Sequence, residues 1–142
     1  MSNRIQKSKY FKQFIFGLFG LMLLAFSIHV NANQYLYNNL YANHIMLSYA
    51  LNAGITIVYF IVLIKYLSKI ITTLGFVFMG GSLLKFVLFF TFFYPLFKSD
   101  GELSKAEFVS FFIPYAIALI LEVYFLIKIL NRYDEQKPSE SH

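Results

Sequence analysis

Four long apolar segments constrain the fold of this chain more than any other feature of its sequence. They span approximately residues 11–30, 45–67, 74–97 and 108–130. An α-helix needs about 20 apolar residues to cross the hydrocarbon core of a bilayer, and each segment reaches that length. Because backbone N–H and C=O groups cannot remain unpaired in lipid, we expect these segments to be helices rather than open strands.

The connections between the segments are short, which favours antiparallel packing of neighbouring helices. The sequence therefore predicts an all-α fold, an integral membrane four-helix bundle made of two antiparallel hairpins. One transmembrane domain would cover residues 1–133. Residues 134–142 are polar and have no apolar periodicity, so we expect them to form a mobile tail.

Composition supports a membrane protein and excludes several other classes. Hydrophobic residues make up 58% of the 142 residues and charged residues only 13%, whereas soluble domains have about 25% charged residues. The absence of cysteine excludes disulfides, thiolate metal sites and cysteine nucleophiles. The net charge of +5 would suit nucleic acid, but the basic residues lie at the ends of apolar segments. We therefore expect the lipid bilayer and other membrane proteins as partners, and no nucleic acid.

The distribution of Lys and Arg predicts the orientation in the membrane. Lys98 and Lys105 stand on one side, among acidic residues that offset them. The other side would carry nine basic residues, which are Arg4, Lys7, Lys9, Lys12, Lys65, Lys69, Lys128, Arg132 and Lys137. Because cytoplasmic loops are enriched in Lys and Arg, both termini are expected to be cytoplasmic.

The first apolar segment has two interpretations. Its basic start and the residues VNA before Asn33 resemble a signal peptide with a cleavage site. However, its apolar stretch is long for a signal peptide, which favours a helix that is retained as a membrane anchor.

Two charged residues within the apolar segments predict an ion pair. Lys85 lies about 16 Å into the segment 74–97, near mid-membrane, where a charge costs at least about 2.5–3.5 kcal/mol. Glu122 is the only acid within an apolar segment. The two helices run in opposite directions, which places these residues at depths that differ by about 4.5 Å. Helical side chains lean toward the N-terminus of their helix, so Lys85 and Glu122 converge.

The pair has three interpretations. It can be a static contact that sets the register of two helices, or a functional site for an ion, a proton path or a partner's carboxylate. Alternatively, Lys85 snorkels alone while Glu122 is bound elsewhere or protonated. Small residues at Gly81 and Ala118, one turn before Lys85 and Glu122, are expected to let the two helices pack closely, and Gly80 is expected to mark a close-packing surface of the third helix.

A polar stripe follows one face of the segment 45–67. Its members are spaced by four, four and three residues, which are Ser48, Asn52, Thr56 and Tyr59. The stripe is interpreted as interhelical hydrogen bonding, with the lining of a pathway as the alternative. Pro114 is expected to kink the segment 108–130 by removing a backbone hydrogen bond near Ser110.

The sequence predicts no catalytic residues, no metal site and no cofactor, and hence no enzyme. It has no plausible nucleophile–base set, no metal-ligand cluster and no phosphate-binding loop. His29 and His44 lie near the ends of their segments and are able to approach each other. Without a nearby carboxylate they indicate interfacial placement rather than a metal site.

The stretch FVFMGGSLLKFVLFF and the later FFIPY resemble the ATP synthase protein I (AtpI) family and related small four-helix bacterial membrane proteins. Gly80, Gly81 and Lys85 match the family's glycine and basic residue in the third helix, and Pro114 matches a proline in the last helix. Ser82, Leu83 and Leu84 stand where the family often has an acid. The resemblance implies a bacterial inner (cytoplasmic) membrane, and an accessory of the F-type ATP synthase that helps to assemble the ring of c subunits.

The leading functional hypothesis is therefore a non-enzymatic accessory or assembly factor that acts by helix–helix contact. The c or a subunits of the ATP synthase, or a second copy of this chain, would be its partners. One alternative is a small ion or solute transporter, or a transporter subunit, that uses Lys85, Glu122 and the polar stripe. Another is a structural subunit of a different membrane complex.

Overall fold

The computed structural model describes residues 2–98, 101 and 104–135, and every regular element within them is helical. This confirms the predicted all-α class. The α-helices are α1 (Ser2–Tyr37), α2 (Ile45–Ile70), α3 (Leu74–Leu88), α4 (Tyr94–Lys98) and α5 (Lys105–Glu135). Short helical turns connect them, which are η1 (Ala42–His44), η2 (Ile71–Thr73) and η3 (Phe89–Phe93).

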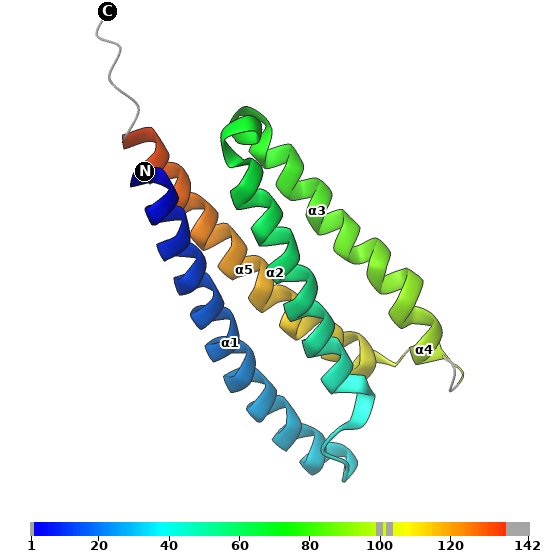
Figure 1. The fold of residues 1–142 in the computed structure, drawn as a ribbon. Helices are drawn as coiled ribbons and strands as arrows, with labels where there is room; N and C mark the ends of the chain where they lie inside the picture. The colour runs from blue at the N-terminus through cyan, green and yellow to red at the C-terminus, as the bar shows by residue number, and fades with distance from the viewer. Residues whose placement is uncertain (1, 99–100, 102–103, 136–142) are drawn as a thin grey trace, which may run out of the picture.

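The elements α3, η3 and α4 follow one another without a break and form one long helix, which we name the α3 span (Figure 1). Within it, η3 is a π-helical turn, in which the Tyr94 N–H donates to the Phe89 carbonyl. The described residues thus form four long helices, each long and apolar enough to cross a membrane. These apolar stretches are Lys7–Tyr37, Ala42–Leu67, Ile71–Leu96 and Lys105–Tyr133.

The helices extend beyond the predicted segments, most of all α1, which was expected over residues 11–30. Hydropathy marks only the part of a helix that suits lipid, whereas backbone hydrogen bonding continues into polar flanks. In α1 the flank includes Asn31, whose side chain donates to the Ser27 carbonyl at 2.7 Å. Of the expected tail, residues 134 and 135 belong to α5, and residues 136–142 lie outside the described residues.

Left-handed asparagines build the turn between α1 and α2. α1 ends before Asn38, which has a φ of 53°, and Asn43 follows with a φ of 62°. Asparagine tolerates this backbone region better than most residues. The Asn33 side chain, which is buried, donates to the Ala42 carbonyl at 3.2 Å and fixes the turn against α1.

The two ends of the bundle differ in what they carry (Figure 1). Both chain termini and the α2–α3 connection lie at one end, which we name the terminal end. The α1–α2 turn and the α4–α5 connection lie toward the other, which we name the loop end. α5 packs against both α1 and α2, and α3 packs beside α2. Half of the apolar stretch of α5 is buried inside the bundle, against 17% for α1 and for the α3 span.

Two apolar clusters hold the helices together. The main core joins α1, α2 and α5 and includes Leu74 of α3, and within it the rings of Phe14 and Phe60 stack with centroids 3.8 Å apart. A smaller aromatic cluster joins η3 to α5, where the centroids of Phe89 and Phe111 are 4.2 Å apart. This second cluster holds the α3 span to α5 at a level toward the loop end.

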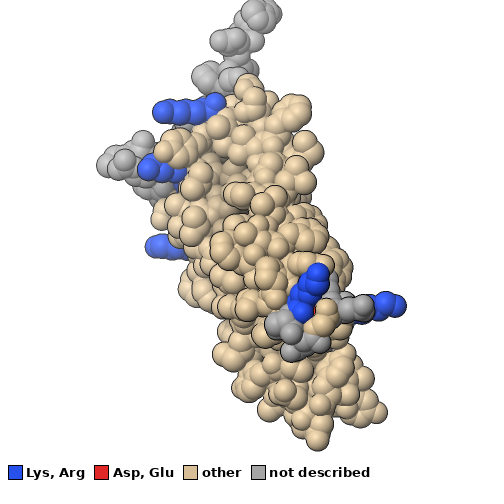
Figure 2. All heavy atoms as spheres, turned by 90° about the vertical axis from the view of Figure 1, so that its right-hand side faces the viewer, with Lys and Arg blue, Asp and Glu red and all other residues tan. Residues whose placement is uncertain are grey.

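The outward face of the bundle is apolar. Large side chains stand fully outward on α1 and α3, such as Phe16 at 78% and Phe76 at 77% exposure. Figure 2 shows the side on which α3 lies, and the broad middle of this face carries no charged side chain. Apolar surface of this extent is unusual for a soluble monomer and suits contact with lipid or with other helices.

Candidate functional site

The structure brings Lys85 of α3 and Glu122 of α5 together inside the bundle. Lys85 Nζ lies 2.6 Å from Glu122 Oε1, a short distance for a charge-assisted hydrogen bond. The two side chains are 4% and 0% exposed. The contact joins the same two helices, in the same register, that the sequence predicts for this pair.

Three further groups surround the Lys85 ammonium. Nζ also donates to Thr56 Oγ1 at 3.3 Å. The ring centroids of Tyr59 and Tyr115 lie 5.6 Å and 6.0 Å from Nζ, within the range of cation–π attraction. A buried charge is unfavourable unless it is paired and hydrogen-bonded. Glu122 pairs with the Lys85 charge, and Thr56 accepts a further hydrogen bond from it.

Gly81 makes the space for one of these rings. A Cβ atom at Gly81 would overlap the Tyr59 ring, so only glycine fits this position without a shift. The Tyr59 hydroxyl donates to the Val77 carbonyl at 2.8 Å, which ties α2 to α3 one turn earlier. Gly81 thus lets α3 approach the ring that covers Lys85.

Within the bundle Gly80 does not pack closely against another helix, unlike Gly81. Gly80 is exposed, and a Cβ atom placed there would meet nothing within 4 Å. Successive residues of an α-helix point about 100° apart, so two adjacent glycines do not share a packing face. Ala118, by contrast, is fully buried in the main core.

The polar stripe of α2 faces the interior. Ser48, Asn52 and Thr56 are buried, and Tyr59 is partly buried. Asn52 Nδ2 donates to the Ser48 carbonyl at 2.8 Å and lies 3.5 Å from the Phe111 carbonyl of α5. The stripe therefore contacts α5 through Asn52 and α3 through Thr56.

Pro114 lies inside α5 without ending it, since the helix continues from Lys105 to Glu135. This continuity does not test the predicted kink, which stays a prediction. Pro114 is fully buried, so the proline ring is enclosed by the bundle. The Asn52 side chain lies beside the Phe111 carbonyl, in the turn where proline weakens backbone hydrogen bonding.

His29 connects three helices toward the loop end. Its Nδ1 lies 3.3 Å from the Tyr49 hydroxyl of α2, and its Nε2 lies 3.4 Å from the Ser110 hydroxyl of α5. Sequence reasoning missed Tyr49, Ser110 and the Tyr115 ring at Lys85. These contacts depend on how each helix is rotated about its own axis relative to its neighbours, and the sequence does not define that rotation.

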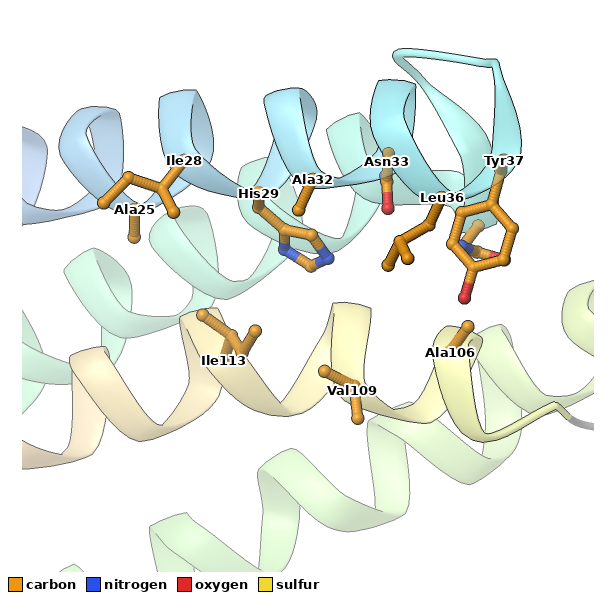
Figure 3. A pocket seen from close by; sticks show the side chains of 11 residues that line it. Ala25, Ile28, His29, Ala32, Asn33, Leu36, Tyr37, Ala106, Val109 and Ile113 are labelled. Atoms are coloured by element: carbon orange, nitrogen blue, oxygen red, sulfur yellow. The ribbon is translucent and has the colours of Figure 1, made fainter.

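A cavity of about 360 Å³ opens between α1 and α5 toward the loop end. His29 and Leu36 of α1 lie opposite Val109 and Ile113 of α5 across it (Figure 3). The remaining lining residues are Ala25, Ile28, Ala32, Asn33, Tyr37, Asn43 and Ala106. The cavity is mainly apolar, and His29 joins it to the hydrogen-bonded groups of the interior.

Among the described residues, no group of three or more His, Cys, Asp or Glu side chains is arranged to hold a metal ion. The arrangement at Lys85 instead provides a neutral, hydrogen-bonded ion pair at mid-bundle. Chemically it is able to fix helix register or to exchange a proton, and it contains no activated nucleophile.

A comparison with protein-family models found a match. The model of a family of unknown function, DUF6168, matches residues 5–133, which include all four long helices and the Lys85–Glu122 pair. Neither the search of curated proteins nor the search of solved structures found a match.

Proposed function

The chain belongs to the DUF6168 family, and we propose that it is a non-enzymatic multi-pass membrane protein that acts through helix–helix contact as an accessory or assembly factor. The observation that supports this proposal most is the burial of both charges. Lys85 and Glu122 bind each other inside the bundle, whereas the outward surface of α3 is uncharged and apolar (Figure 2). Such a surface suits another transmembrane helix.

We further propose a bacterial inner membrane with both termini in the cytoplasm. The basic residues on the terminal-end parts of the helices include Lys65, Lys69, Lys128 and Arg132. The connection at the loop end has Lys98 and Lys105 beside acidic residues. This asymmetry is the one that the positive-inside rule associates with a cytoplasmic terminal end.

The outward face of α3 is the proposed contact surface. It carries large exposed side chains around an exposed glycine, Gly80, which lets a neighbouring helix approach closely. Its large members are Phe76, Met79, Leu83, Leu84 and Val87. The resemblance of this stretch to the AtpI family supports the c or a subunits of the F-type ATP synthase as partners. Because Glu122 already binds Lys85, the proposal assigns partner contact to this face and not to Lys85.

Purification from native membranes tests this proposal. The tagged chain is isolated in mild detergent, and the co-purifying proteins are identified by mass spectrometry. We expect c or a subunits with the wild type and their loss with Gly80→Leu. Gly20→Leu on α1 is the matched control, because a Cβ at Gly20 also meets nothing within 4 Å. Isolation with an unrelated complex would end the ATP synthase proposal, and equal recovery with both variants would exclude the α3 face.

A second candidate is a small ion or solute transporter, or a subunit of one. The row of buried polar groups along α2, which ends at the Lys85–Glu122 pair, favours it. A measurement of ion flux in proteoliposomes separates the two candidates. Flux that is lost in Glu122→Gln supports transport, and the absence of flux in the wild type excludes it for the isolated chain.

A further inference from the structure

Buried polar groups form a row that leads from the cavity between α1 and α5 to the ion pair. His29 lines the cavity and contacts Ser110 Oγ at 3.4 Å (Figure 3). Asn52 follows, beside the Phe111 carbonyl that is adjacent to Ser110 in the chain. Thr56 lies one turn further along α2 and accepts a hydrogen bond from Lys85. The row therefore crosses the part of the bundle between the loop end and Glu122.

Two atoms on this row are buried and unsatisfied. Ser48 Oγ and Glu122 Oε2 have no hydrogen-bond partner within the part of the chain that the structure describes. A buried polar atom without a partner is unfavourable, and a charged one is more unfavourable still. In folded proteins such atoms are commonly satisfied by ordered water. Both atoms therefore indicate where water would bind.

The opposite side of the pair is closed by apolar packing. Between Glu122 and the terminal end, α2 and α5 fill the interior with buried aliphatic and aromatic side chains. These are Leu63, Leu67, Phe125, Leu126 and Ile129. No polar row like that of Ser48, Asn52 and Thr56 continues through this described region. Among the described residues, the row of buried polar side chains along α2 therefore lies on the loop-end side of Glu122, and apolar side chains fill the other side.

We propose that water enters through the cavity between α1 and α5 and follows this row to Glu122 Oε2, with no passage to the terminal end. The titratable groups around Glu122 are Lys85 from α3, Tyr59 from α2 and Tyr115 from α5. α1 approaches α5 near this depth through Gly17, beside Leu121. The inference does not depend on the proposed accessory function.

The site has a consequence for proton exchange. Water at Oε2 can deliver a proton to that oxygen while Oε1 continues to accept the hydrogen bond from Lys85 Nζ. The pair would then change its net charge without losing its contact. Since the passage reaches only the loop end, protons would exchange with that side of the membrane alone.

Cysteine accessibility tests the passage, because the chain has no cysteine and each variant carries a single thiol. Ser48→Cys, Asn52→Cys and Thr56→Cys are placed in membrane vesicles of either orientation and exposed to Ag⁺. The readout is the loss of later maleimide labelling after denaturation. Leu63→Cys is the control on the same helix beyond the pair. Ser104→Cys and Lys69→Cys, both exposed, mark the two membrane sides.

We expect Ser48→Cys and Asn52→Cys to lose maleimide labelling when Ag⁺ is added on the Ser104→Cys side, and Leu63→Cys to keep it from both sides. Thr56→Cys should behave like Asn52→Cys. Labelling of Ser48→Cys and Asn52→Cys that is retained as fully as that of Leu63→Cys would overturn the proposal. Equal loss in Leu63→Cys would overturn the one-sided closure.

A second pair of variants tests whether the cavity is the entrance, and a separate measurement checks that both proteins are folded. Ala32→Phe fills the cavity, whereas Ala50→Phe adds the same ring at an exposed position of α2 outside the cavity lining. Each is combined with Ser48→Cys, and monodisperse elution in detergent checks that the protein is folded. Protection of the thiol by Ala32→Phe but not by Ala50→Phe is expected. Equal reactivity in both would exclude this cavity as the entrance.

Discussion

Lys85 of α3 is stabilised by groups from two other helices, α2 and α5. Glu122 of α5 supplies the opposite charge, Thr56 of α2 supplies a hydroxyl, and Tyr59 and Tyr115 supply ring faces. An unpaired charge at mid-membrane depth is unfavourable, so the lysine favours the arrangement in which all these helices meet. At the scale of single residues, a few polar contacts inside an apolar interior join α2, α3 and α5.

Gly81→Ala should destabilise the protein by about 1–3 kcal/mol, because its methyl group forces the Tyr59 ring to move. Thermal unfolding in detergent measures the change. Gly80→Ala is the matched control and should leave stability unchanged or slightly raised, since its methyl group meets nothing. Tyr59→Ala in the Gly81→Ala background should remove the clash. Equal effects of Gly80→Ala and Gly81→Ala would contradict this account.

At the scale of elements, the π-helical turn η3 attaches the α3 span to α5. Phe89 and Phe93 of η3 are buried against Phe111 and Tyr115. Phe92, in the same turn, points outward and is 60% exposed. A π-turn widens the helix locally, which changes the direction of the side chains that follow it. Here the buried rings of the turn add to the ion pair in attaching the α3 span to α5.

Phe111→Ala should destabilise the bundle by about 3–5 kcal/mol, as expected for loss of a buried aromatic side chain. Hydrogen exchange should show the loss of protection concentrated in residues 86–96. Phe92→Ala removes an exposed ring from the same turn and should have little effect. A loss of protection spread evenly over α1 and α2 would contradict a local clamp.

Sequence reasoning located the helices and the charge pair but not the orientation of every face. Apolar length identifies a spanning helix by itself, and Lys85 and Glu122 are rare charges whose depths are calculable from helical rise. The rotation of each helix is less well defined, because 18 Phe residues offer many equivalent apolar faces. The sequence therefore does not separate Gly81, which packs inside the bundle, from the exposed Gly80, and it does not predict the contacts of His29 with Tyr49 and Ser110.

At the scale of the whole molecule, the ends of the bundle define an orientation that is testable directly. Ser104→Cys at the loop end should react with a membrane-impermeant maleimide added to intact cells. Lys69→Cys, near the terminal end, should react only after the inner membrane is opened. We expect this labelling pattern because Lys and Arg are in excess at the terminal end, and the positive-inside rule places such an end in the cytoplasm. The reverse pattern would contradict the proposed cytoplasmic termini.

The central claim is that the Lys85–Glu122 pair holds the α3 span to the rest of the bundle. Thermal unfolding of Lys85→Met, Glu122→Gln and the double variant tests it most directly. Each single variant leaves one buried group unpaired and should cost about 3–5 kcal/mol, whereas the double variant should recover most of that loss. Additive losses in the double variant, or single variants as stable as the wild type, would contradict the claim.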